Sequence, residues 1–183
     1  MSRKLVLFGD SLFGKVNKTE SLMLEKALDQ EFDVYNCATG GWNTNDLLKK
    51  APFIATLDAD LFIVSVGTND GSPWKQVNIN DFERNLGPIL DEFSNSNVIL
   101  FPPPPVHEES RPKDKQIPNE TMKAYYDAAV RVCVKGGIPY IHSWEIFMEL
   151  QNRTQSYHVE DGVHLSEYGY EVLFGEISKV IKQ

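Results

Sequence analysis

The stretch Lys4-Leu5-Val6-Leu7-Phe8-Gly9-Asp10-Ser11-Leu12 decides the fold of this chain. Its apolar residues 5–8 end at a glycine, which is typical of a strand buried on both faces of a parallel sheet. In open α/β folds, the chemistry lies just beyond the carboxyl ends of such strands. Ser11 sits at that position, with a helix expected after it, and is therefore a candidate nucleophile. Taken alone, Asp10 and Ser11 also fit an ordinary loop and helix cap.

Strand-like and helix-like segments alternate along the rest of the chain. Short apolar runs predict further strands at residues 32–35, 60–66, 97–101 and 138–141. Apolar spacing predicts helices at residues 21–29, 45–51, 80–93, 122–135, 144–150 and 166–181. This alternation predicts a single domain over residues 1–183, of α/β class. We expect a five-stranded parallel sheet with helices on both faces, a three-layer α/β/α sandwich.

Two helix boundaries are predicted from single residues. Pro52 is expected to stop the helix at residues 45–51, because proline lacks the N–H that continues a helix. Asn80 is expected to cap the helix at residues 80–93, with Glu83 completing a capping box.

The composition describes an ordinary globular chain. Its 183 residues are 42% hydrophobic and 24% charged, enough for a core without disulfide staples. The net charge of −8 disfavours nucleic acid and anionic membranes as partners, since both need clustered Lys and Arg. Cys37 and Cys133 are too few and too far apart for a zinc site or a disulfide framework. They predict two buried thiols in a reducing cytosol, with a single bridge between them as the alternative.

The apolar segments are short. None approaches the ~18 consecutive apolar residues of a membrane span. The run at residues 5–8 is also shorter than the ~7–15 residues of a signal-peptide core. We therefore expect a cytoplasmic protein without a membrane partner, and the sequence leaves its oligomeric state open.

A base for the candidate nucleophile is predicted near the carboxyl terminus. Asp161 and His164 lie three residues apart, and on a helical turn this spacing places both side chains on one face. The carboxylate could then hold the imidazole Nδ1–H and leave Nε2 for Ser11. Read alone, the pair also fits a helix start with a surface histidine. No carboxylate precedes the other histidines at this spacing, and we expect structural or surface roles for His107, His142 and His158.

Donors for an oxyanion are predicted in two loops. Backbone N–H groups of glycine turns and Asn side chains are common donors. Gly40 and Gly41 permit close approach of the backbone to a substrate, and Asn69 follows the predicted third strand. Each of these residues also fits an ordinary turn.

Four aromatic residues fall just beyond predicted strand ends: Phe13, Trp42, Trp74 and Trp144. There they could form an apolar acyl pocket or a stacking surface for a sugar ring. The alternative is that they seal the edge of the core. The proline-rich, charged segment at residues 102–118 is expected to shape the mouth of the pocket.

Several other site motifs are missing from the sequence. There is no G-x-S-x-G elbow, no G-x-x-x-x-G-K-[ST] loop and no G-x-G-x-x-G run. No His/Asp cluster has the spacing of a catalytic metal site. A flavodoxin-like flavin or phosphate binder is a further option, but residues 10–15 make a poor phosphate loop.

Taken together, three sequence blocks resemble the SGNH, or GDSL-type, esterase and lipase family. They are Gly9-Asp10-Ser11-Leu12, Gly67-x-Asn69-Asp70 and Asp161-x-x-His164, in the family's order. The resemblance covers nearly the whole chain and implies the flavodoxin-like SGNH hydrolase fold.

The resemblance also implies roles for these residues. It implies Ser11 as nucleophile, His164 as base and Asp161 as the orienting partner. It implies an oxyanion hole from the N–H groups of Ser11 and Gly41 and from the Asn69 side chain. The segment that holds Gly41 is the loosest match.

The implied reaction is hydrolysis of a carboxylic ester through an acyl-serine, with no metal or organic cofactor. We expect a small soluble ester, either a short-chain acyl ester or an acetylated sugar. A thioesterase or lysophospholipase would use the same residues. A non-catalytic α/β binding module is the alternative from another class.

Overall fold

In the computed structural model, a parallel sheet forms around the apolar stretch at the start of the chain. The structure describes residues 2–151 and 155–182. The strands are β1 (Arg3–Gly9), β2 (Phe32–Asn36), β3 (Leu61–Ser65) and β4 (Asn97–Phe101). They pair in parallel in the order β2-β1-β3-β4. Residues 5–8 are buried, as the continuous apolar run predicts.

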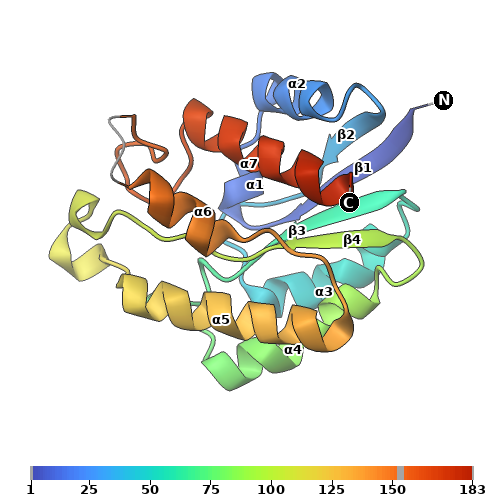
Figure 1. The fold of residues 1–183 in the computed structure, drawn as a ribbon. Helices are drawn as coiled ribbons and strands as arrows, with labels where there is room; N and C mark the ends of the chain where they lie inside the picture. Colours follow the sequence, from blue (N-terminus) through green and yellow to red (C-terminus); the bar gives the residue numbers. More distant parts are fainter. Residues whose placement is uncertain (1, 152–154, 183) are drawn as a thin grey trace.

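Helices cover both faces of this sheet. They are α1 (Ser11–Gly14), α2 (Lys18–Ala27), α3 (Thr44–Ala55), α4 (Ile79–Asp91), α5 (Asn119–Gly136), α6 (Ser143–Leu150) and α7 (Glu167–Ile181). Figure 1 shows α2, α6 and α7 on one side of the strands and α3, α4 and α5 on the other. Side chains of β1 point alternately to the two faces of the sheet. Leu5 and Leu7 belong to one core cluster, and Val6 and Phe8 belong to the other. The predicted three-layer α/β/α sandwich is confirmed.

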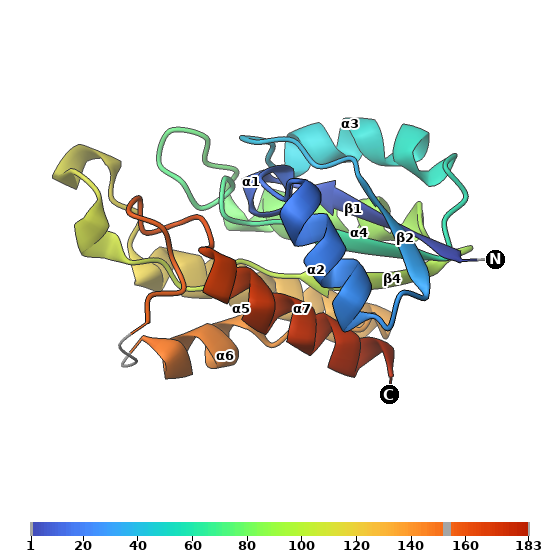
Figure 2. The same cartoon turned by 90° about the horizontal axis from the view of Figure 1, so that it is seen from above.

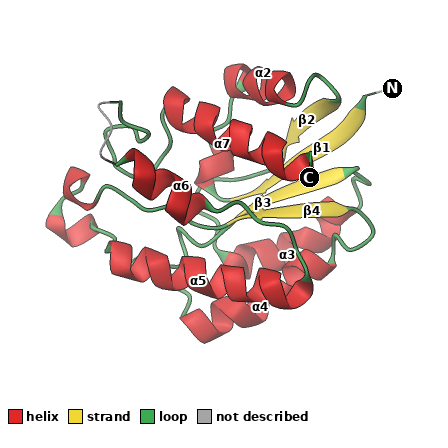
Figure 3. Ribbon diagram, viewed as in Figure 1, coloured by secondary structure: helices red, strands yellow, loops and turns green. Residues whose placement is uncertain are grey.

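The sheet has four strands where the sequence predicts five. Residues 138–141 make a single bridge, Tyr140 with Leu100, and Figure 3 draws this segment as loop. Pro139 has no N–H to donate to a ladder. The Ile138 N–H donates instead to the Cys133 carbonyl, 2.9 Å away, at the end of α5. With both donors lost, the segment cannot extend its pairing along β4.

Two helix boundaries also differ from the prediction. Pro52 lies inside α3, which continues to Ala55, because Pro52 is exposed while Ile54 is buried in the core. Burial of that helix face outweighs the one hydrogen bond that proline removes. Asn78, not Asn80, caps α4, and its side chain accepts the Asp81 N–H at 3.0 Å.

The strand order creates a crevice between β1 and β3. The chain passes from β1 to β2 on one side and then crosses to β3 on the other. Loops that leave the two strands at such a reversal diverge and open a site at the carboxyl edge. Figure 2 shows the loops after β3 and β4, and the loop before α7, gathered beyond this edge. Two short 3₁₀ turns, Glu108–Ser110 and Lys113–Lys115, lie in the loop after β4.

Candidate active site

Ser11 begins a four-residue helix at the carboxyl end of β1. The Asp10 side chain caps this helix by accepting the Leu12 N–H at 3.0 Å. Leu12 and Phe13 are fully buried and anchor the helix, whereas Ser11 is partly exposed. The strand end therefore presents the serine hydroxyl outward on a short, fixed helix.

Asp161 and His164 meet through a turn that Asp161 itself stabilises. Asp161 Oδ1 accepts the N–H groups of Val163 and His164, each at 2.9 Å. Gly162 stands between them with a φ of +68°, a conformation that favours glycine. The expectation of a helical turn is wrong, because the Asp side chain replaces the backbone acceptor and α7 begins only after Ser166.

Three side chains from opposite ends of the chain form one hydrogen-bonded row. His164 Nδ1 lies 2.5 Å from Asp161 Oδ2, and His164 Nε2 lies 2.8 Å from Ser11 Oγ. A neutral imidazole has one donor and one acceptor nitrogen. Because a carboxylate can only accept, these partners place the imidazole proton on Nδ1 and leave Nε2 to accept the serine hydroxyl proton.

The same turn keeps Asp161 ionised. Partial burial alone would raise the pKa of this carboxyl group, but hydrogen bonds from the backbone and imidazole of His164 and from the Val163 N–H outweigh it. The pKa of Asp161 falls to about 2. At neutral pH, a fixed negative charge therefore faces the His164 ring.

The predicted oxyanion donors lie on the same cavity as Ser11 and His164. This cavity has a volume of about 370 Å³, and Gly41 and Asn69 both line it. Asn69 Nδ2 donates to the Trp42 carbonyl at 2.8 Å, which fixes the amide and leaves its second hydrogen free for a ligand. Gly41, with a φ of +84°, lines the cavity, whereas Gly40 is not part of the lining.

Of the four aromatic residues predicted to form the pocket, Trp74 is the one that lines this cavity within the described chain. Phe13 is fully buried in the core, with its ring 5.6 Å from that of Phe101, because the inner face of α1 packs on the sheet. The Trp42 ring packs edge-on against Phe8, and the Trp144 ring packs near Tyr126. Phe13, Trp42 and Trp144 are not part of the lining of this cavity.

Sequence reasoning missed the charged residues at this cavity. Lys15, Lys75 and Arg111 line it, and Ile117 adds an apolar side chain from the predicted mouth segment. Nothing in their local sequence marks these residues, since each lies in a polar loop whose position depends on the fold. The expectation that residues 102–118 border the pocket agrees with the places of Arg111 and Ile117.

Two carboxyl groups lie buried behind the site. Asp10 accepts the Ser65 hydroxyl at 2.9 Å, and Asp70 accepts the Thr44 N–H and hydroxyl at 2.9 and 2.5 Å. The pKa of each is raised to about 6, mainly by burial, and the charge of Asp70 contributes to the raised pKa of Asp10. These residues tie β1, β3 and α3 to the loop after β3, so they hold the loops that carry the site.

The remaining histidines make other contacts. His107 Nδ1 contacts the Ser110 hydroxyl at 2.8 Å, and the His142 ring packs on Tyr140. His158 is buried, and burial lowers its pKa to about 4. In residues 2–151 and 155–182, His164 is the histidine hydrogen-bonded to Ser11.

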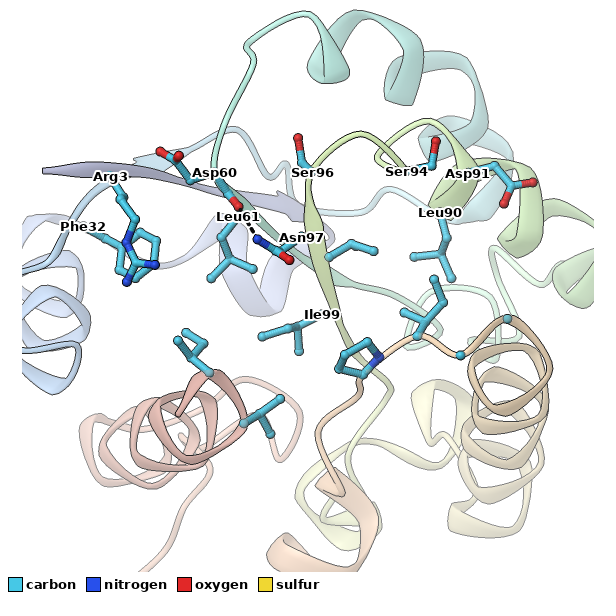
Figure 4. A pocket seen from close by; sticks show the side chains of 17 residues that line it. Arg3, Phe32, Asp60, Leu61, Leu90, Asp91, Ser94, Ser96, Asn97 and Ile99 are labelled. Atoms are coloured by element: carbon cyan, nitrogen blue, oxygen red, sulfur yellow. Dashed lines mark hydrogen bonds between the residues drawn. The ribbon is translucent and has the colours of Figure 1, made fainter. Parts of the chain in front are cut away.

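A larger cavity, of about 540 Å³, lies at the opposite edge of the sheet. It opens where residues 136–139 diverge from β4, and the end of α7 closes one side. Figure 4 shows the side chains of Leu61, Leu90 and Ile99 around it, with Asp60 and Asp91 toward its rim. Its lining contains no histidine or cysteine.

Neither edge carries an evident metal centre. Among the described residues, no group of three or more His, Cys, Asp or Glu side chains is arranged to hold a metal ion. No helix in this part of the chain is long and apolar enough to cross a bilayer.

The hydrogen-bonded row of Ser11, His164 and Asp161, held at the carboxyl edge of an α/β/α fold, has the arrangement that serine hydrolases use. Residues 7–172 match the model of the GDSL-like Lipase/Acylhydrolase family. The chain belongs to this family of carboxylic ester hydrolases, as the three sequence blocks indicate.

Relatives span the length of the chain. A GDSL esterase/lipase of Arabidopsis thaliana is 26% identical, with 100% of this chain and 87% of the relative covered. An isoamyl acetate-hydrolyzing esterase 1 homolog of Mus musculus is 26% identical over 93% of this chain and 78% of its own. The crystal structure of the lipase/acylhydrolase from Enterococcus faecalis superposes with a TM-score of 0.88 and 27% identity, covering 98% and 95% of the two chains.

Proposed function

We propose that this protein hydrolyses a small carboxylic ester through an acyl-serine intermediate. Ser11 is the nucleophile, His164 the general base and Asp161 the residue that orients the imidazole. The observation that carries the proposal is the row of contacts at 2.5 and 2.8 Å from Asp161 through His164 to Ser11. Both lie close to the range in which a base can take the proton of a nucleophile.

In the first half of the reaction, Ser11 Oγ attacks the ester carbonyl carbon and its proton passes to His164 Nε2. The carbonyl electron pair becomes an oxyanion, which accepts hydrogen bonds from the N–H groups of Ser11 and Gly41 and from the Asn69 amide. Asp161 stabilises the imidazolium. When the intermediate collapses, the leaving oxygen takes the Nε2 proton, and the alcohol departs from the acyl-serine.

In the second half, water replaces the alcohol. His164 Nε2 takes one proton from water while the water oxygen attacks the acyl carbon. The second intermediate expels Ser11 Oγ, which recovers its proton from the imidazolium. The net reaction consumes one ester and one water and yields one carboxylic acid and one alcohol.

The size of the cavity supports a small substrate. Its volume of about 370 Å³ is near the lower end of the ~300–1,000 Å³ range of ligand pockets. The mouse relative is named for isoamyl acetate, an ester with a two-carbon acyl group, which agrees with a short acyl chain here.

The test is hydrolysis of p-nitrophenyl acetate by the wild type and by Ser11→Ala, with Ser21→Ala on the outer helix α2 as the matched control. We expect Ser11→Ala to lose activity by at least ~10⁴-fold, because no other group supplies the acyl acceptor. A fluorophosphonate should label Ser11 in the wild type. Activity that survives in Ser11→Ala contradicts the assigned nucleophile.

A chain-length series of p-nitrophenyl esters tests the substrate class. We expect kcat/KM to be highest for short acyl chains. A maximum at eight carbons or longer would contradict a small substrate and favour a lysophospholipase. A higher kcat/KM for the thioester than for the ester of the same acyl group would instead favour a thioesterase.

The proposed steps use only side chains, backbone N–H groups and water. Dialysis against a chelator is therefore expected to leave the hydrolysis rate unchanged. A loss that a divalent metal restores would contradict this mechanism.

We further propose a reducing compartment such as the cytoplasm as the place of action. Cys37 and Cys133 are free thiols, which is usual where glutathione keeps cysteines reduced. Fractionation of cells with an antibody to this chain tests the location.

A further inference from the structure

The charge at the active-site cavity is opposite to that of the whole chain. The protein contains 26 acidic and 18 basic residues. Yet the charged side chains that line the cavity beside Ser11 and His164 are the cations Lys15, Lys75 and Arg111, and no Asp or Glu lines it. A cavity lined by one sign of charge concentrates ligands of the other sign.

These three cations have no carboxylate partner in the described part of the chain. The ion pairs found there use other basic residues, such as Arg3 with Glu31 and Arg131 with Glu83. Lys75 Nζ donates to the Gly41 carbonyl at 2.5 Å, which occupies one of its three N–H donors and leaves its charge uncompensated.

Arg111 is held so that its outer edge is free. Its Nε donates to the Asp161 carbonyl at 3.1 Å, and its guanidinium carbon lies 5.6 Å from the centre of the Trp74 ring. Among residues 2–151 and 155–182, this is the hydrogen bond that the Arg111 side chain makes. The two terminal nitrogens are thus available as a planar fork, which matches a carboxylate or phosphate.

We propose that the substrate is an anionic ester, in which a carboxylate or phosphate lies a few bonds from the ester carbonyl. Arg111 binds the anion, and Lys75 and Lys15 add to the attraction. This inference rests on the proposed esterase function and names the class of its substrate. The anion belongs to either the acyl or the alcohol part of the ester, and the experiment separates these two sources.

A different role for the cations would be to stabilise the oxyanion of every ester. That effect acts equally on charged and neutral substrates, because each forms the same oxyanion. Recognition of an anion instead changes the ratio of kcat/KM between a charged ester and its neutral counterpart. A variant that also disturbs the site, for example by losing the contact of Arg111 with Asp161, lowers kcat/KM for both esters of a pair and leaves their ratio unchanged.

The experiment uses two matched pairs of esters, with hydrolysis followed by proton release. Monoethyl glutarate and ethyl pentanoate differ by a charge on the acyl side. The compounds 4-acetoxybutanoate and butyl acetate differ by a charge on the alcohol side. We expect one anionic ester to exceed its neutral partner by about ten-fold or more in kcat/KM. The preference should fall between ~10 mM and ~1 M salt, as the Debye length shortens from ~30 to ~3 Å.

Variants locate the preference. Arg111→Met is expected to lower the charged-to-neutral ratio about ten-fold, and Arg111→Lys to restore part of it, because an ammonium supplies the charge without the fork. Lys75→Met and Lys15→Met should lower the ratio about two- to five-fold. Lys135→Met removes the same charge from the exposed far end of α5 and should leave both rates unchanged.

The possible failures are distinguishable. If the neutral esters are hydrolysed as well as both anionic ones, or if Arg111→Met keeps the wild-type ratio, this inference is overturned and the esterase function stands. If no ester of either pair is hydrolysed and a fluorophosphonate does not label Ser11, the proposed function fails and takes this inference with it.

Discussion

A cavity at the amino edge of the sheet is larger than the cavity at the carboxyl edge, but its lining contains no histidine. The cavity at the amino edge measures about 540 Å³ and is lined mainly by apolar and small polar side chains. The cavity at the carboxyl edge measures about 370 Å³ and contains Ser11, His164 and Asn69. The first lies beside a segment that pairs with β4 through the single bridge of Tyr140 with Leu100, and the second lies where loops diverge at a reversal of strand order. Volume therefore says less about function here than the position relative to strand direction.

The largest effect is expected when the central residue of the row Asp161, His164 and Ser11 is replaced. His164→Gln removes the base and should lower kcat by at least ~10³-fold, because no other group accepts the Ser11 proton. His142→Gln, which removes a ring packed on Tyr140, is the matched control and should retain activity. Steady-state kinetics on p-nitrophenyl acetate provide the measurement. Comparable losses in both variants would mean that the row is structural.

The next effect compares two asparagines that make the same type of bond at opposite edges. Asn69 Nδ2 donates to the Trp42 carbonyl at 2.8 Å, and Asn97 Nδ2 donates to the Asp60 carbonyl at 3.2 Å. Asn69→Ala should lower kcat by ~10²–10³-fold with little change in KM, as expected for an oxyanion donor. Asn97→Ala should leave kcat unchanged. A change in KM alone for Asn69→Ala would argue against the oxyanion role.

A third effect concerns stability behind the carboxyl edge. The pKa of Asp70 is about 6 in the folded protein and near its ordinary value of 3.8 when unfolded, so the folded state holds this proton more tightly. Wild-type stability should therefore fall as pH rises from about 4 to about 6. Asp70→Asn removes the contribution of Asp70 to this loss, and its unfolding free energy relative to wild type should rise by up to ~3 kcal/mol across that range. Urea titrations at several pH values measure it. Parallel pH profiles for the two proteins would contradict the raised pKa.

The smallest effect belongs to the amino edge. Val180 lines the larger cavity near the end of α7 and is only partly buried. Val180→Ala should lower the unfolding free energy by ~1 kcal/mol or less and leave kcat/KM unchanged. Thermal melts and the ester assay together test this. A loss of activity would show that the two edges are coupled.

The sequence predicts the residues of the site better than their local geometry. The buried strand before Ser11 and the position of Asn69 after a second such strand suffice to place both at one edge, because parallel strands share their direction. The spacing of Asp161 and His164 predicts their proximity but not the turn that achieves it. In that turn, an Asp side chain competes with the backbone for N–H donors, which spacing alone does not reveal.

What the sequence could not predict depends on tertiary contacts. Pro139 has no N–H, and the N–H of Ile138 donates to the end of α5. The predicted fifth strand therefore does not form a ladder with β4, although its residues are apolar. Phe13 and Trp42 follow strands as a pocket wall would, but Phe13 is buried in one core cluster and Trp42 packs, partly buried, against the other. Arg111 reaches the cavity only because the long loop after β4 folds back to the loop before α7.

The contact between the loop after β4 and the turn before α7 has a consequence for engineering. The His107 N–H donates to the Gly162 carbonyl at 2.7 Å, and a Cβ placed on Gly162 would lie 2.4 Å from the His107 carbonyl oxygen. The loop that borders the substrate and the turn that positions the base are therefore in direct backbone contact. A directed-evolution library in residues 107–111, made to change selectivity, would also alter turnover, so selectivity and rate would evolve together in this enzyme.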